Sequence, residues 1–369
     1  MKKKLKIVCI IGTRPEAIKM APVILELKNK YWAEVIIVAT AQHRDLMDQV
    51  LSIFGIVPDI DLNIMLPNQS LCTLTSRLLE KLEKVYLDLR PDVVLAQGDT
   101  TTVMAASLAC FYHKIKFGHI EAGLRTGSIL NPFPEEANRV IASIFAEWHF
   151  CPTDISKNNL LNEGVDSSKT IVTGNTVIDA LMIASTKKSN ASFEINDDKK
   201  LILVTAHRRE NFGEPLLNIC DAIRSLAINN PGVNILFPVH PNPNIKTIAY
   251  DFLDGLSNVT LCDPMEYIEF VHAMKKSYFI ISDSGGVQEE APALGKPVLV
   301  LRDETERPEA VAMGVVKLIG TSKNNIIFEA QNLLDKQDQY MIMARGVTPY
   351  GDGNAAKRII ATLEKDFQI

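Results

Sequence analysis

The segment Tyr278–Pro297 reads YFIISDSGGVQEEAPALGKP and holds the pattern that decides the fold. A short apolar run ends at small polar residues, two adjacent glycines follow, and a helix-like segment then includes Gln288. Glycines at a strand-to-helix junction leave backbone N–H groups open to a ligand, and a helix N-terminus carries partial positive charge. The turn therefore predicts an anion site. Glu289 and Glu290 would repel an anion there, so they need an explanation of their own.

Length and composition indicate an ordinary globular protein with two domains. The chain has 369 residues, which exceeds the size at which one hydrophobic core usually stops growing. Hydrophobic residues make up 47% of the chain and charged residues 22%, which is enough for a sizeable core. The net charge of -5 argues against a general nucleic-acid binder, because that function needs clustered Lys and Arg.

The cysteines and the apolar segments favour a cytoplasmic protein. The six cysteines are widely spaced, without a CxxC pair or metal-ligand spacing, so we expect small buried hydrophobic residues in a reducing compartment. The N-terminus has a basic start, but its apolar run Ile7–Ile11 is too short for a signal peptide. No segment approaches the ~20 apolar residues of a bilayer span, so we expect no membrane contact.

Short runs of Val, Ile and Leu alternate with longer amphipathic segments, which is typical of buried parallel strands joined by crossover helices. The predicted strands lie at Ile7–Ile11, Val35–Val38, Val93–Leu95, around Phe117, Trp148–Phe150, Ile171–Val172, Leu201–Val204, Ile235–Phe237, Val259–Leu261, Tyr278–Ile281 and Val298–Leu301. The polar segment Ser185–Lys200 is the predicted linker. We therefore predict an α/β protein with two Rossmann-like, doubly wound parallel-sheet domains, at residues 1–180 and 197–352.

Polar clusters lie just past the ends of the predicted strands. The clusters are GTRPE, GDTTT, HRRENFG, HPNP, DSGG and RDETERPE. In open parallel sheets ligands bind outside this edge, so two domains with their edges facing would form one cleft. The chain contains neither GxGxxG nor a Walker A motif, so the sequence does not support a nicotinamide cofactor.

Carboxylates at these strand ends suit general acid–base chemistry. Asp99 follows an apolar strand in GDTTT, where it could also cap the next helix. Glu121 lies in GHIEAGLRT, and Glu135 follows two prolines in NPFPEEANR, where an acidic helix start is the alternative. Three carboxylates at one sheet edge favour an acid–base site.

Basic residues at the strand ends predict phosphate recognition. Arg14 and Lys19 follow the first strand and could both face the cleft, although Arg14 and Glu16 could instead form a solvated pair. His207 opens HRRENFG, where a histidine and two arginines at a strand end suit a phosphate. A structural Arg–Glu network is the alternative there.

The SGG turn completes the predicted nucleotide site. Ser284, Gly285 and Gly286 would hold a phosphate, and Glu290, one turn into the helix, could accept hydrogen bonds from ribose hydroxyls. His240 in VHPNP is either a satisfied loop histidine or a binding residue.

The motifs together carry a family resemblance. Their order along the chain is GTRPEAIKMAP, TAQHRDLMDQVL, QGDTTT, HIEAGLRT, PFPEEANR, HRRENFG, HPNP, SDSGGVQEEAP and ERPEA. From about Ile7 to the C-terminal helix, the chain resembles the non-hydrolysing UDP-N-acetylglucosamine 2-epimerases. The resemblance implies a glycosyltransferase-B-like fold, in which a C-terminal helix within residues 353–369 packs back on the N-terminal domain. It also implies reversible interconversion of UDP-GlcNAc and UDP-ManNAc in a homodimer, without a nicotinamide or a metal.

The resemblance also implies a role for each matching residue. Catalytic roles fall on Asp99, Glu121, Glu135 and His207. Substrate contacts fall on Arg14, Lys19, Phe270, Ser284, Gly285, Gly286 and Glu290. Among these, Phe270 in YIEFV looks like the uracil contact, and His207 would lie near the departing diphosphate.

Some family members also bind a second UDP-GlcNAc as an activator. Gln42, His43 and His240 match positions associated with that allosteric site. Asp45 and Asn68 stand where activator-responsive members can carry Gln and Arg, so this chain departs from the responsive pattern.

Three alternatives share parts of the pattern. A glycosyltransferase of the same fold would move the sugar to an acceptor, and a hydrolysing epimerase would release free ManNAc. The third alternative is a non-enzymatic sensor of nucleotide sugars. The GTRPE turn with Glu121 and Glu135 favours the non-hydrolysing epimerase, and the retained catalytic set argues against a sensor.

Overall fold

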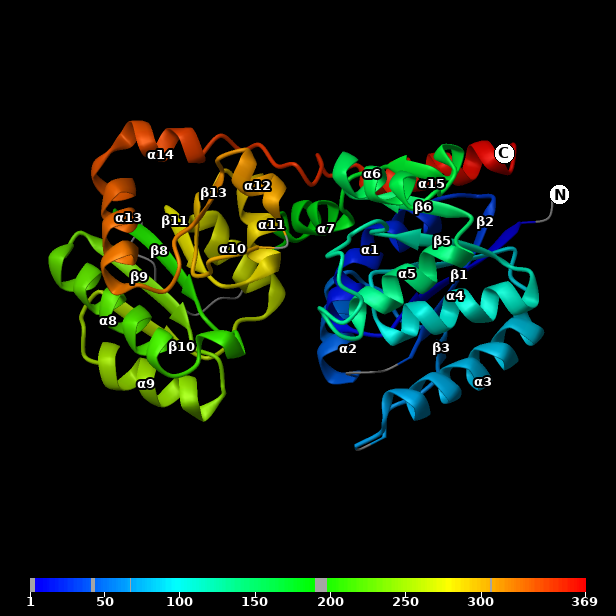
Figure 1. Ribbon diagram of the computed structural model, residues 1–369, viewed down its shortest axis with the longest axis horizontal. Helices are drawn as coiled ribbons and strands as arrows, with labels where there is room; N and C mark the ends of the chain where they lie inside the picture. Colours follow the sequence, from blue (N-terminus) through cyan, green and yellow to red (C-terminus); the bar gives the residue numbers. More distant parts are fainter. Residues whose placement is uncertain (1–3, 41–43, 67, 190–197, 306) are drawn as a thin grey trace. The chain divides into compact units, whose positions relative to one another are not determined.

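The computed structural model describes residues 4–40, 44–66, 68–189, 198–305 and 307–369. The chain divides into two compact units, each built on its own parallel sheet (Figure 1). Unit 1 spans Met1–Met182 and Tyr350–Ile369, and unit 2 spans Ile183–Pro349. The chain therefore leaves unit 1 once and returns to it at its C-terminal end.

Unit 1 contains a seven-stranded sheet in the order β3-β2-β1-β4-β5-β6-β7, and all of its pairings are parallel. Its strands are β1 (Leu5–Ile11), β2 (Ala33–Ala39), β3 (Ile60–Asp61), β4 (Val93–Gln97), β5 (Lys116–Ile120), β6 (Trp148–Cys151) and β7 (Thr170–Val172). Its helices are α1 (Arg14–Lys28), α2 (Arg44–Ile53), α3 (Leu71–Leu89), α4 (Thr101–His113), α5 (Glu135–Phe145), α6 (Asp154–Asn162), the 3₁₀ turn η1 (Ser167–Lys169), most of α7 (Thr176–Ser185), and α15 (Ala355–Asp366).

Unit 2 contains a six-stranded parallel sheet in the order β10-β9-β8-β11-β12-β13. Its strands are β8 (Lys200–Thr205), β9 (Val233–Pro238), β10 (Val259–Cys262), β11 (Phe279–Ser282), β12 (Val298–Val300) and β13 (Val316–Leu318). Its helices are the 3₁₀ turn η2 (Arg209–Asn211), α8 (Glu214–Asn229), α9 (Pro243–Leu253), α10 (Tyr267–Lys276), α11 (Gly285–Ala293), α12 (Pro308–Ala312), α13 (Lys323–Asp335) and α14 (Gln337–Met343).

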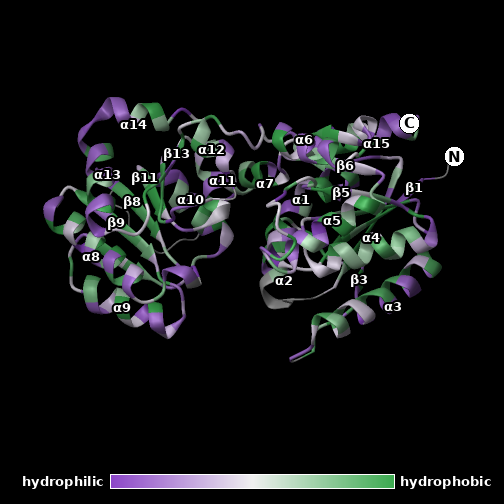
Figure 2. Ribbon diagram, viewed as in Figure 1, coloured by the Kyte–Doolittle hydropathy of each residue, from purple (hydrophilic) through white to green (hydrophobic). Residues whose placement is uncertain are grey.

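The predicted two-sheet α/β fold is confirmed, and each of the eleven predicted strands overlaps a strand of the structure. β4 and β11 are buried along their whole length, because helices cover both faces of a parallel sheet. Figure 2 shows the resulting pattern, with hydrophobic residues along the strands and hydrophilic residues concentrated on the outer helices. The sequence did not predict β3 and β13, which are short strands that each lie at one edge of their sheet.

The last helix, α15, belongs to unit 1, where it appears in red in Figure 1. It packs against α1, and Glu364 binds both Lys30 Nζ and Trp32 Nε1 at 3.0 Å. These contacts attach the returning C-terminal segment to the unit that contains the N-terminal sheet.

The cysteines differ in one respect from the prediction. All six are unpaired, Cys9, Cys110, Cys151 and Cys220 are buried, and Cys262 is half-buried. Cys72, however, is exposed at the start of α3, so the expectation of burial is wrong for this residue. Among the described residues, no helix has both the length and the apolar character needed to cross a bilayer.

Both sheets reverse their strand order beside their first strand. β1 lies between β2 and β4, and β8 lies between β9 and β11. Ligands of open parallel sheets bind at such a reversal, outside the carboxyl ends of the strands. The turns that follow β1 and β4 in unit 1, and β8 and β11 in unit 2, are therefore the expected ligand-binding positions.

Candidate active site

The turn after β1 is organised by Glu16, a residue of α1. Its Oε2 accepts the N–H groups of Gly12 and Thr13 at 2.5 and 2.8 Å, and Thr100 Oγ1 donates to its Oε1 at 2.5 Å. Burial raises the pKa of Glu16 to about 7. Glu16 therefore joins the turns after β1 and β4, and it does not form the solvated pair with Arg14 considered above.

Glu121, just past the end of β5, is held by three donors. Lys19 Nζ lies 2.5 Å and Asn175 Nδ2 lies 2.7 Å from its Oε1, and Gln97 Nε2 donates to its Oε2. The Glu121 backbone has φ 64°, a left-handed conformation that is rare outside glycine and concentrates at functional sites. Its side chain is only 7% exposed. The structure thus brings the predicted residues Lys19 and Glu121 together in a rigid arrangement.

Asp99, after β4, contacts the first turns of α5. Arg139 Nη2 and Nε donate to its Oδ2 at 2.6 and 2.9 Å, and Asn138 Nδ2 donates to its carbonyl oxygen at 2.8 Å. Glu135 is the first residue of α5 and lies one turn before Arg139 on the same side of the helix. Glu136 is buried and its carboxylate binds Arg139 Nη1 at 2.9 Å, so it holds the side chain that contacts Asp99.

His119 and Arg125, which lie close to Glu121 in sequence, contact other groups than its carboxylate. His119 is fully buried, its Nε2 lies 2.7 Å from the Gly98 carbonyl oxygen, and burial lowers its pKa to about 4. Arg125 forms two bonds with the Glu163 carboxylate, at 2.7 and 2.8 Å. Neutral His119 therefore supports the turn that carries Asp99.

In unit 2, the glycine turn forms the start of α11. Ser284 is the N-cap residue and makes no side-chain capping bond, so the first-turn N–H groups remain open to a ligand. A Cβ atom at Gly285 would lie 2.7 Å from Arg307 Nη1, so the guanidinium lies directly against this glycine. Arg307 Nε also binds Glu289 Oε1 at 2.7 Å. This pairing neutralises the glutamate that seemed to oppose an anion, and it places the Arg307 Nη groups, which are hydrogen-bond donors, beside the turn.

Glu290 and Phe270 lie on neighbouring parts of unit 2. Glu290 is 7% exposed and accepts a 2.7 Å hydrogen bond from the Tyr267 hydroxyl. Tyr267 and the half-buried Phe270 both belong to α10, three residues apart. A nucleoside contact through Phe270 and Glu290 would therefore involve α10 and α11 together.

His207, just after β8, is positioned by Asp283, just after β11. Asp283 Oδ2 accepts the N–H groups of His207 and Arg208 at 2.9 and 2.8 Å and the Asn211 side-chain amide at 3.0 Å. His207 Nδ1 lies 3.2 Å from Asp283 Oδ1. The His207 ring also stacks on His240, with 6.2 Å between ring centroids. The fully buried Asp283 thus fixes the loop that presents His207.

The predicted activator residues are only partly described. Gln42 and His43 lie outside the described residues. Asn68 is exposed with φ 55°, and His240 is exposed at the end of β9. In the part of the chain that the structure describes, no group of three or more His, Cys, Asp or Glu residues could hold a metal ion.

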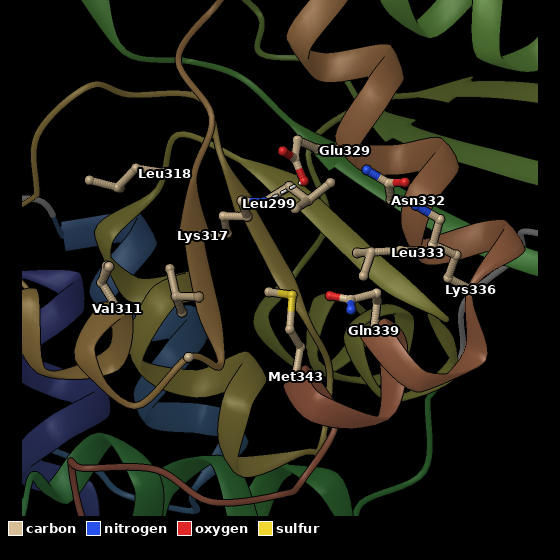
Figure 3. Close-up of a pocket in the computed structure, with 12 residues that line it drawn as sticks. Leu299, Val311, Lys317, Leu318, Glu329, Asn332, Leu333, Lys336, Gln339 and Met343 are labelled. Atoms are coloured by element: carbon tan, nitrogen blue, oxygen red, sulfur yellow. Dashed lines mark hydrogen bonds and ion pairs between the residues drawn. The ribbon is translucent and has the colours of Figure 1, made fainter.

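A cavity of about 490 Å³ lies elsewhere in unit 2, among β13, α13 and α14 (Figure 3). It combines apolar residues such as Leu333 and Met343 with the ion pair of Lys317 Nζ and Glu329 Oε2 at 2.6 Å. The residues that line it include none of the predicted site residues. The cavity is therefore separate from the turns after β8 and β11.

The structure adds supporting residues that the sequence reasoning left unassigned. They are Gln97, Arg139 and Asn175 in unit 1 and Tyr267, Asp283 and Arg307 in unit 2. Gln97, Asn175 and Asp283 lie at or just after the ends of β4, β7 and β11. The rule that polar residues at strand ends form sites could have found these three residues.

Known proteins resemble this chain over nearly its whole length. The family model described as UDP-N-acetylglucosamine 2-epimerase matches residues 25–364. The chain belongs to this family. A UDP-N-acetylglucosamine 2-epimerase of Campylobacter jejuni is 51% identical over 373 residues, which cover 98% of this chain and 97% of the relative.

Solved structures agree with the family assignment. The crystal structure of a Neisseria meningitidis family member, bound to UDP-GlcNAc, is 53% identical and has a TM-score of 0.89, covering 98% of this chain and all of the other. A glycosyltransferase of kitacinnamycin covers 98% of this chain with a TM-score of 0.66 at 12% identity. That second likeness shows a shared fold alone, so the family assignment rests on the epimerases.

Proposed function

We propose that this protein interconverts UDP-GlcNAc and UDP-ManNAc by inverting C2 of the sugar, without hydrolysing the nucleotide sugar. Membership of the epimerase family supports the proposal, as does the UDP-GlcNAc bound to the Neisseria relative. The observation that carries it is the Glu121 carboxylate, which three donors hold at the end of β5, in the same sheet as Asp99.

The chemistry explains why carboxylates are needed. The C2 hydrogen has no neighbouring carbonyl group, so direct deprotonation would leave an unstabilised carbanion. Cleavage of the C1–O bond first sends the electron pair to the UDP diphosphate and gives the sugar oxocarbenium character. A base then removes the C2 proton, which yields 2-acetamidoglucal and UDP. Addition of UDP to C1, with proton delivery to the opposite face of C2, completes the epimerisation.

We assign the proton transfers and the stabilisation of the cation to Asp99, Glu121 and Glu135 of unit 1. Arg139 binds one oxygen of Asp99 twice, which fixes the direction of that carboxylate. Lys19 Nζ binds the Glu121 carboxylate, and the same ammonium group would also contact the substrate. Arg14, the first residue of α1, would hold the reacting end of the substrate together with Lys19.

We assign UDP binding to unit 2. The open N–H groups of Gly285 and Gly286, the Ser284 hydroxyl at the N-cap and the adjacent Arg307 guanidinium would offer hydrogen-bond donors to a diphosphate. His207, held by Asp283, would stabilise the departing diphosphate. Glu290 would accept hydrogen bonds from the ribose and Phe270 would contact the uracil.

The proposal extends to the assembly and the setting of the enzyme. Phe111, Tyr112 and Ile144 on α4 and α5 are each more than half exposed, which supports a homodimer that covers them. The six unpaired cysteines agree with a cytoplasmic enzyme. The product would supply ManNAc units for surface polysaccharide synthesis. The position of a second UDP-GlcNAc would be at Gln42, His43 and His240, where Asp45 and Asn68 depart from the pattern of activator-responsive members.

Incubation of the purified protein with UDP-GlcNAc alone, followed by NMR of the sugar signals, tests this function. We expect UDP-ManNAc to accumulate to a constant ratio with UDP-GlcNAc. Free ManNAc as the product would indicate the hydrolysing reaction instead. An unchanged UDP-GlcNAc signal would refute the epimerase.

A further inference from the structure

Asn175 occupies the loop between β7 and α7 and is 2% exposed. Its Oδ1 accepts the Val177 N–H at 3.0 Å, which fixes the orientation of the side-chain amide. The Nδ2 group must therefore point the other way, where it lies 2.7 Å from Glu121 Oε1. Both ends of this amide are thus committed, one to the start of α7 and one to the carboxylate.

The backbone of Asn175 is equally constrained. Its N–H donates to the Tyr350 carbonyl oxygen at 2.7 Å, in the segment where the chain returns to unit 1. A Cβ atom at Gly174 would lie 3.2 Å from Gly351 Cα, so the two glycines let the two segments cross at close range. The returning segment therefore holds the loop from which Asn175 reaches Glu121.

Glu121 needs such support because its own backbone is unfavourable. A non-glycine residue at φ 64° keeps this conformation only when its surroundings determine it. Lys19 and Asn175 share Oε1, but they differ in kind. Lys19 has a long flexible stem, whereas the Asn175 amide is short, buried and fixed at both ends.

We propose that Asn175 is a positioning residue that orients the Glu121 carboxylate for proton transfer, with the Tyr350–Gly351 segment as its backbone support. This inference rests on the proposed function, in which Glu121 acts on the sugar. Asn175 acts through Glu121, so its loss changes the turnover of bound substrate and leaves UDP binding, assigned to unit 2, unchanged.

The test is N175D, which keeps the acceptor for Val177 but replaces the donor with a second carboxylate oxygen. We expect kcat to fall roughly 10- to 100-fold, the cost of a misplaced catalytic group, while the Kd for UDP measured by calorimetry stays at the wild-type value. N159D is the matched control, because Asn159 Nδ2 donates at 3.0 Å to the carbonyl oxygen of Gly123 rather than to the carboxylate. A kcat of N175D no lower than that of N159D would overturn the inference.

If N175D folds poorly, a double-mutant cycle of melting temperatures tests the contact between Asn175 and Glu121. N175D should lower the melting temperature by roughly 3–8 °C, since it sets two carboxylates against each other. Adding E121Q should recover much of that loss, because it removes the repulsion between the two carboxylates. Additive losses would overturn the contact. A wild-type protein without epimerase activity would refute the proposed function instead, and the cycle would still decide whether Asn175 orients residue 121.

Discussion

Replacement of Asp283 by asparagine should destabilise unit 2 and disable His207. Asp283 is fully buried, and its Oδ2 accepts hydrogen bonds from His207, Arg208 and Asn211 at 2.8 to 3.0 Å. An asparagine oxygen in the same place could still accept these bonds, but the acceptor would be neutral. The D283N variant therefore isolates the contribution of the charge from that of the shape.

The magnitude follows from the number of donors. A hydrogen bond to a charged group contributes about 1 kcal/mol more than a neutral one, so three bonds to one carboxylate oxygen give a loss of roughly 3 kcal/mol. For a unit of this size that corresponds to a melting temperature lower by roughly 6–12 °C. The amide would also face His207 Nδ1, which now lies 3.2 Å from Asp283 Oδ1, so the imidazole should shift and kcat should fall.

Calorimetric unfolding and steady-state turnover of D283N would measure both effects. D263N is the matched control, because Asp263 is 84% exposed and pairs with Lys246 at 3.3 Å on the surface. That surface pair should contribute less than ~1 kcal/mol. If D283N melts within the same small range as D263N and keeps its turnover, Asp283 does not organise the His207 loop.

Two further predictions concern pH, and they have opposite signs. Burial lowers the pKa of His149 to about 3 and that of its cross-strand neighbour His119 to about 4. Both histidines are therefore neutral in the folded protein, and their contribution to the unfolding free energy is complete above pH ~6.5. This contribution is lost as the pH falls towards 4. H149F should flatten the fall in unfolding free energy between pH 6.5 and 4 in urea titrations, and an unchanged slope would contradict the assignment. Burial raises the pKa of Glu16 to about 7. Its contribution to the unfolding free energy is therefore complete below pH ~4.5, and roughly 3 kcal/mol of it is lost as the pH rises through 7. Relative to wild type, E16Q should therefore gain stability between pH 5 and 8, and a constant difference would show that Glu16 does not titrate in this range.

The strands could be predicted because buried parallel strands are continuous apolar runs. Val93–Gln97 is buried throughout, and its sequence VVLAQ shows this directly. β3 and β13 escaped prediction because neither forms an apolar run: Ile60–Asp61 has two residues, and Val316–Leu318 contains an exposed lysine. Hydropathy is thus sufficient for the interior strands and for the edge strands β7 and β10, but it is insufficient for β3 and β13.

The position of a site residue could be predicted where it follows a strand, but its bonding partner could not be predicted where the two residues are remote in sequence. Asp99 and Glu121 follow β4 and β5, so their location was expected. Asn175 lies 54 residues from Glu121 and Asp283 lies 76 from His207. Their roles depend on how neighbouring strand ends converge, which only the folded sheet specifies.

The proposed reaction breaks and remakes the C2–H bond of a UDP-linked sugar. Incubation of the protein with UDP-GlcNAc in D2O, followed by proton NMR, measures this directly. We predict that deuterium enters at C2 of both UDP-GlcNAc and UDP-ManNAc as the two forms interconvert. Formation of UDP-ManNAc with the C2 proton retained, or the absence of any exchange, would contradict the account.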